Sequence, residues 1–86
     1  MFRIDYSSKA RRQLKKLDPY IANLIYDWII ENLEDCEDPR LRGKAMTGDM
    51  LGYWRYRVGK YRIIAEIFDN SLLIQIIEID HRRQIY

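Results

Sequence analysis

The feature that most constrains the fold is a run of alternating apolar and polar residues that a two-residue turn divides. Residues 53–58 alternate, Gly59-Lys60 places glycine first, and residues 61–68 alternate again. Glycine in the first turn position is typical of a type II′ β-hairpin, whose twist suits the two flanking strands. We therefore predict an antiparallel hairpin with this turn at its tip, which fixes the register of both strands.

This register divides the hairpin into an apolar face and a polar face. The predicted core face holds Trp54, Tyr56, Val58, Tyr61, Ile63, Ala65 and Ile67. The other face carries Tyr53, Arg55, Arg57, Arg62, Ile64, Glu66 and Phe68. Arg57 and Arg62 lie directly opposite each other there, and such like-charge pairs destabilise a sheet by a few tenths to about 1 kcal/mol. The cluster indicates an anionic ligand; the alternative is that these arginines face solvent, or pair with Glu66 and with acids of a helix.

Two helices are predicted in the N-terminal half. Residues 2–6 alternate as a half-buried strand, and Ser7 or Ser8 offers an N-cap for a short helix with a basic outer face. The pair Asp18-Pro19 ends that helix and starts a second one, which carries acids outside an apolar stripe.

The C-terminal half adds strands to this pattern. Residues 40–52 contain several glycines and read as a long loop, which in a small domain is often functional. After the hairpin, the β-branched run Leu72–Ile79 predicts a last strand. The expected fold is a single α+β domain over residues 1–86, with two N-terminal helices packed on a small antiparallel sheet in the order β-α-α-β-β-β.

Composition excludes several classes of protein. The 86 residues are 48% hydrophobic and 33% charged, as in globular domains. No apolar run approaches the roughly 18 residues of a membrane span and no targeting segment is visible, so we expect a cytoplasmic protein without a membrane partner. One cysteine and one histidine cannot build a protein-only zinc site. No phosphate-binding or dinucleotide motif is present either, so we expect no cofactor and no metal.

Charge is sorted into blocks along the chain. Residues 1–17 and 40–62 are strongly basic, whereas residues 18–39 and 63–80 contain acids and no base. A folded domain with this pattern can present separate basic and acidic surfaces, or simply solvated helix faces of one sign. Arginine offers a fork that suits phosphate, and aromatic side chains stack on bases. We therefore predict that the arginine cluster binds phosphate groups.

Two segments together resemble a known family. The first is the run Gly52-Tyr53-Trp54-Arg55-Tyr56-Arg57-Val58-Gly59-Lys60-Tyr61-Arg62-Ile63-Ile64, and the second is His81-Arg82-Arg83-Gln84-Ile85-Tyr86. Their pairing resembles toxins of the RelE/ParE superfamily over essentially the whole chain. Similarity to the RelE branch implies a ribosome-dependent endoribonuclease, or mRNA interferase, that cuts mRNA in the A site and inhibits translation. It also implies a cognate RelB-like antitoxin encoded nearby, through which alone the toxin would reach operator DNA.

The resemblance further implies roles for individual residues in metal-independent cleavage by attack of a 2′-hydroxyl. By position, the catalytic residues are Arg55, Arg57, Arg62, Arg82 and Tyr86, and His81 of the same C-terminal motif is a further catalytic candidate. We expect RNA contacts from Arg42, Lys44, Tyr53, Lys60 and Arg83. Arg55 and Arg57 stand where the best-known RelE pattern has lysines, and arginine stays protonated at any working pH. Neither can be the general base, which leaves Tyr86 and His81 as candidates for proton transfer.

Two other functions stay open from the sequence. The ParE branch shares the fold but poisons DNA gyrase, and the set Arg62, Arg82 and Tyr86 favours RelE over it. The other alternative is a non-enzymatic nucleic-acid-binding module, or a co-repressor that acts with its antitoxin. Mapping mRNA ends after incubation with translating ribosomes separates all three.

Overall fold

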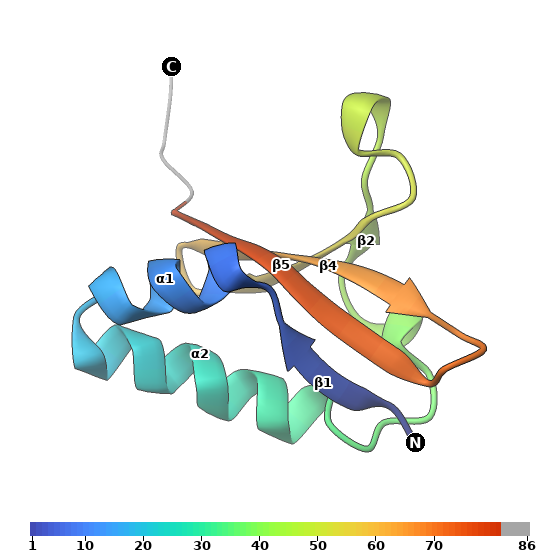
Figure 1. The fold of residues 1–86 in the computed structure, drawn as a ribbon, viewed down its shortest axis with the longest axis horizontal. Helices are drawn as coiled ribbons and strands as arrows, with labels where there is room; N and C mark the ends of the chain where they lie inside the picture. Colours follow the sequence, from blue (N-terminus) through green and yellow to red (C-terminus); the bar gives the residue numbers. More distant parts are fainter. Residues whose placement is uncertain (82–86) are drawn as a thin grey trace.

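The computed structural model describes residues 1–81 and contains a five-stranded sheet with two helices against it (Figure 1). The helices are α1 (Ser8–Lys16) and α2 (Pro19–Asn32), and the strands are β1 (Arg3–Tyr6), β2 (Lys44–Ala45), β3 (Trp54–Val58), β4 (Tyr61–Phe68) and β5 (Leu73–His81). The strand order is β1-β5-β4-β3-β2. The predicted α+β class is confirmed, with two helices between the first strand and the hairpin.

Two features of the sheet differ from the prediction. β1 pairs with β5 in parallel, so the sheet is mixed rather than wholly antiparallel. A parallel pair needs a long crossover connection, which no local residue pattern reveals. The expected loop over residues 40–52 holds β2 and a 3₁₀ turn at Gly48–Met50, and another such turn at Pro39–Leu41 leads into it. A strand of two residues is too short to show alternation in the sequence.

Both helices begin at the predicted caps. The Ser7 hydroxyl accepts the backbone N–H of Ala10 at 3.0 Å, and the Asp18 carboxylate accepts the N–H of Tyr20 at 2.8 Å. These side chains satisfy first-turn amides that have no partner inside the helix. No helix within residues 1–81 is long and apolar enough to cross a membrane.

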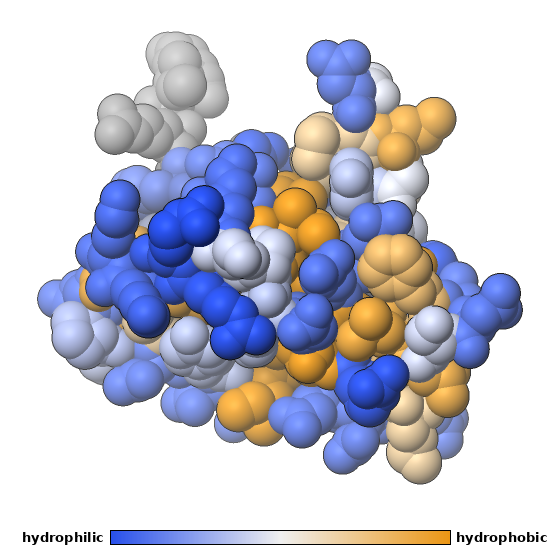
Figure 2. Space-filling model, in the orientation of Figure 1, coloured by the Kyte–Doolittle hydropathy of each residue, from blue (hydrophilic) through white to orange (hydrophobic). Residues whose placement is uncertain are grey.

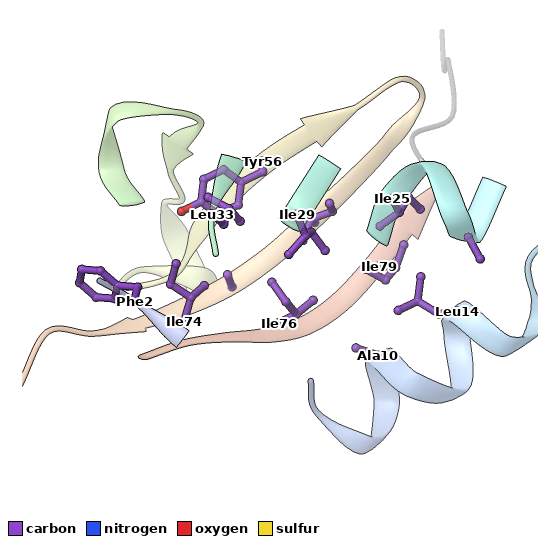
Figure 3. Packing of buried hydrophobic residues seen from close by; sticks show 13 residues of the cluster. Phe2, Ala10, Leu14, Ile25, Ile29, Leu33, Tyr56, Ile74, Ile76 and Ile79 are labelled. Carbon is purple, nitrogen blue, oxygen red and sulfur yellow. The ribbon is translucent and has the colours of Figure 1, made fainter. Parts of the chain in front are cut away.

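The core lies between the two helices and one face of the sheet, and Figure 3 shows Ala10 and Leu14 of α1 within it. Tyr56 of β3, Ile63 of β4 and Ile76 of β5 are fully buried, as are Ile25 and Ile29 of α2. The remaining apolar residues predicted for this face of the hairpin pack against the same cluster. The predicted core face is therefore confirmed, and the polar residues of the hairpin lie on the opposite face of the sheet.

Helix α1 completes the edge of β5 where β1 stops. The Gln13 side-chain oxygen accepts the N–H of Ile79 at 2.7 Å, and the Ser7 hydroxyl donates to the carbonyl of Ile77 at 2.7 Å. Side chains thus replace the hydrogen bonds that a longer β1 would make, and they cover part of an open sheet edge. Over α1 the surface is mainly hydrophilic (Figure 2).

Gly43 is predicted to tolerate no side chain. Its φ is +76°, and a Cβ there would lie 2.2 Å from the carbonyl oxygen of Arg55, so β2 would have to move away from β3. We expect Gly43→Ala to lower the free energy of unfolding by about 3 kcal/mol or more. Gly48→Ala is the matched control, because Gly48 has a φ of +64° with open space around it. Gly48→Ala should lower the free energy of unfolding by only about 1 kcal/mol. Equal losses in urea denaturation would show that backbone conformation alone requires glycine at Gly43.

Candidate anion-binding site

The arginines of the hairpin lie on the sheet face that points away from α2. Arg57 is the register partner of Arg62, and Arg55 is the partner of Ile64, as the turn predicted. Tyr56 lies between the two β3 arginines and packs on α2, with its ring centroid 5.6 Å from that of Trp28. Since successive strand residues point to opposite faces, Arg55 and Arg57 point away from the core. We call this surface the arginine face; its members are Lys44, Arg55, Arg57, Arg62, Ile64, Glu78 and Asp80.

Charge changes sign across the arginine face. Lys44 of the edge strand β2 is the register partner of Arg55 on β3. On the other side, β5 contributes Glu78 and, directly beside Arg62, Asp80. Cations from β2 and β3 therefore face acids from β5, with Arg62 at the boundary. An anionic ligand is attracted to the β2–β3 side and repelled from β5.

A hollow lies on this cationic side. It has a volume of about 300 Å³ and is lined by Gly43, Lys44, Arg55 and Arg57. Within residues 1–81, none of these three cations forms an ion pair, and the alternative pairing with Glu66 or acids of α2 is not observed. Their charge is thus available to an external anion. The glycine matters here because it lets β2 approach β3 closely.

Arg62 differs from its neighbours because it has an acidic partner. Its Nη2 donates to Oδ2 of Asp80 at 2.6 Å, and the two side chains are 30% and 39% exposed. Its Nε is buried and has no hydrogen-bond partner in the part of the chain that the structure describes. Sequence reasoning missed Asp80, because β5 carries an extra residue, Ile77, between the partners of Ile64 and Ala65. Such a bulge shifts the register of a strand without a clear sequence signal.

Ile64 was predicted to lie on an open face, but it is only 3% exposed. Arg55 and Glu78 are its partners on the neighbouring strands. Long charged side chains cover apolar neighbours with their aliphatic stems while their heads stay in water. The arginine face therefore has a buried apolar centre beneath its charges.

His81 does not lie on the arginine face. It is the register partner of Tyr61, and the two rings stack with centroids 4.7 Å apart. Both line an apolar groove of about 570 Å³ between α2 and the tip of the hairpin. The structure therefore separates His81 from the arginines by the thickness of the sheet.

The other predicted RNA-binding residues are dispersed. Lys60 lines the same groove as His81, and Arg42 lines a different hollow near Cys36. Tyr53 is half-buried just before β3, and its carbonyl accepts the N–H of Met46 at 3.0 Å. Of the eleven predicted site residues, Arg82, Arg83 and Tyr86 lie outside the described residues. The structure thus brings together Lys44, Arg55, Arg57 and Arg62.

The fold and the arginine face define a small α+β domain with a cationic hollow on one face of its sheet. Residues 4–86 match the family described as the ParE toxin of type II toxin–antitoxin systems, parDE. Because this match spans nearly the whole chain, the protein belongs to that family. It is a type II toxin with a RelE-like fold.

Individual relatives agree with this assignment. Toxin RelG of Mycobacterium tuberculosis is 29% identical over 85 residues, which cover 99% of this chain and 95% of RelG. A chain of the toxin–antitoxin complex RelBE2 from the same species gives a TM-score of 0.86 at 28% identity, covering 96% of this chain and 93% of that one. The isolated E. coli RelE toxin gives 0.76 at 14% identity, over 99% and 88% of the two chains, and this likeness shows the fold alone.

Arg57 is predicted to lower the stability of the free protein. We expect Arg57→Ala to raise the free energy of unfolding by up to about 1 kcal/mol, because it removes the like charge opposite Arg62. Arg62→Ala should instead lower it by about 1 kcal/mol or less, since the ion pair with Asp80 is partly exposed. Urea unfolding at low and high salt measures both, and the gain from Arg57→Ala should shrink as salt screens the repulsion. A marked loss of stability in Arg57→Ala would instead assign this arginine a structural role.

Proposed function

We propose that this toxin is a ribosome-dependent endoribonuclease that cuts mRNA in the A site and thereby stops translation. The observation that best supports this function is the hollow lined by Lys44, Arg55 and Arg57, whose cations have no ion-pair partner within residues 1–81. Arginine and lysine grouped around one hollow suit a phosphodiester, whose oxygens accept charge-assisted hydrogen bonds. The similarity to RelG over nearly the full length of both chains adds to this support.

Metal-independent cleavage needs three kinds of group around the phosphate. A base takes the proton from the 2′-hydroxyl, whose oxygen then forms a bond to phosphorus. The bond from phosphorus to the 5′ oxygen breaks, and an acid gives that oxygen a proton. Positive groups stabilise the negative charge that builds up on the phosphate oxygens. We assign this last role to Lys44, Arg55, Arg57 and Arg62, and also to Arg82.

Proton transfer requires a group that titrates, which arginine does not. Of the two candidates, His81 stacks on Tyr61 on the groove side of the sheet. We therefore favour Tyr86 as the group that exchanges a proton with the substrate. An arginine beside a tyrosine favours its anionic form, which is the form that can accept the proton of the 2′-hydroxyl.

We also propose a cognate RelB-like antitoxin, encoded nearby, as partner. Solved structures of RelBE2 and of E. coli RelBE are toxin–antitoxin complexes with chains of this fold. The groove beside α2 offers an apolar surface to such a partner; its lining includes Leu24, which is 45% exposed. In this proposal, operator DNA is reached only through the antitoxin, and the toxin acts in the cytoplasm, where ribosomes and mRNA are found.

A DNA gyrase poison is the second candidate function. The specific observation that favours it is the family match, whose description names the ParE toxin. A gyrase poison needs no cluster of cations built around a phosphodiester, so the hollow on the arginine face weighs against it.

Expression of the toxin alone should halt protein synthesis and leave mRNA cut within reading frames. Arg62→Ala should lower cleavage by about 10²-fold, a loss comparable to that of one donor to transition-state charge. Arg40→Ala is the matched control, because Arg40 is also ion-paired, with Asp69 at 2.9 Å, just beyond the far end of β4. Mapping of mRNA 5′ ends with purified translating ribosomes measures both variants. Intact mRNA together with broken DNA would replace this proposal with the gyrase alternative.

Tyr86→Phe should lower cleavage by about 10²-fold or more, because it removes the hydroxyl proposed to transfer the proton. His81→Ala should change the rate little. The same ribosome cleavage assay on both variants distinguishes the two residues. A large loss in His81→Ala, with cleavage retained in Tyr86→Phe, would assign proton transfer to the histidine.

A further inference from the structure

We propose that Asp80 is a positioning residue that holds the guanidinium of Arg62 in place for the substrate phosphate. The ion pair joins Arg62 Nη2 to Asp80 Oδ2 across β4 and β5 at 2.6 Å. This inference rests on the proposed function, because it concerns the cleavage step. It gives a reason for the presence of an acid beside a group of cations, where its negative charge would by itself repel a phosphate.

The first argument is the charge around Arg62. In its row of the sheet, Arg62 lies between Arg57 on β3 and Asp80 on β5. Without the carboxylate, its nearest partner across a strand would be another arginine, and like charges in that position repel. Asp80 lies on the opposite side of Arg62 from Arg57, so the ion pair keeps the guanidinium at the β5 border of the cationic cluster. Asp80 therefore opposes a repulsion that the cationic cluster itself creates.

The second argument is the way in which Asp80 binds. Arg40 and Asp69 form a two-pronged pair in which Nη1 and Nη2 each contact a carboxylate oxygen, at 2.9 and 3.0 Å. In the pair of Arg62 with Asp80, only Nη2 is engaged. A guanidinium has five N–H donors, so this single contact restrains the group and leaves other donors for a phosphate.

The third argument is burial. Nε of Arg62 is buried and has no hydrogen-bond partner in the described part of the chain. The inner part of the guanidinium is therefore packed into the sheet, whereas a freely solvated arginine would keep Nε in water. Partly exposed ion pairs contribute about 1 kcal/mol or less to stability. The geometry of the pair thus matters more for the position of Arg62 than for the stability of the fold.

The test is a double-mutant cycle in the ribosome cleavage assay with the full chain. Asp80→Ala should lower kcat by about 10-fold or more with little change in KM, because misplacing a charge-stabilising group weakens transition-state binding. Asp80→Glu should restore part of the rate. The double variant Arg62→Ala with Asp80→Ala should cleave no more slowly than Arg62→Ala alone. Asp69→Ala, which removes the ion pair of Asp69 with Arg40, is the matched control and should cleave normally.

A second measurement tests the positioning of Arg62 in the free protein and does not depend on cleavage. In ¹⁵N-labelled protein, the Nε–Hε signal of Arg62 should exchange slowly with water, because this atom is buried. It should exchange fast in Asp80→Ala and stay slow in Asp69→Ala, with the backbone amide spectrum otherwise preserved. If the wild-type protein cleaves no mRNA, the proposed function fails while this signal still reports on the positioning.

Several outcomes would overturn the inference in a wild-type protein that cleaves. The first is unchanged cleavage in Asp80→Ala, and the second is an additive loss in the double variant. Faster cleavage in Asp80→Ala would also overturn it, because Asp80 would then compete with the phosphate for Arg62. An unchanged exchange rate of the Arg62 signal in Asp80→Ala would exclude positioning directly.

Discussion

Hydrogen bonding along both edges of β5 holds the two halves of the chain together. β1 pairs in parallel with the first part of this strand, and α1 covers the next part through Gln13 and Ser7. β4 pairs with it along the other edge. The N-terminal strand and first helix thus share one strand with the hairpin that carries the arginines. β5 ends at Asp80 and His81. The register between β4 and β5 therefore decides whether Asp80 or His81 lies beside Arg62.

Those parts of the fold and site that depend on neighbouring residues could be predicted from the sequence. The turn at Gly59 fixed the hairpin register, and with it the placement of Arg57 opposite Arg62. Short polar residues before an amphipathic run located the caps Ser7 and Asp18. In each case the physical cause lies within a few residues of its effect, so the sequence pattern contains the information needed.

The rest depends on contacts between distant segments. The parallel pairing of β1 with β5 and the two-residue strand β2 leave no periodic pattern. The extra residue Ile77 in β5 changes which side chains meet those of β4. This change places Asp80 beside Arg62 and His81 on the side of the groove. Which acid joins the site therefore depends on the pairing of β4 with β5, which the sequence pattern does not reveal. The register partners of Ile64, which are Arg55 and Glu78, also come from other strands, so its burial could not be predicted from its own segment.

The opposition of Arg57 and Arg62 links folding to binding. In the free toxin the two charges repel each other, so part of the stability that the core provides is offset. An anion bound beside Arg57 in the hollow offsets this repulsion, so the free energy of binding then includes a gain from relieving it. By thermodynamic linkage, any polyanion that occupies the hollow also stabilises the folded state. Within residues 1–81, the positive charge of the arginine face is thus balanced only on the side of β5, where Asp80 pairs with Arg62.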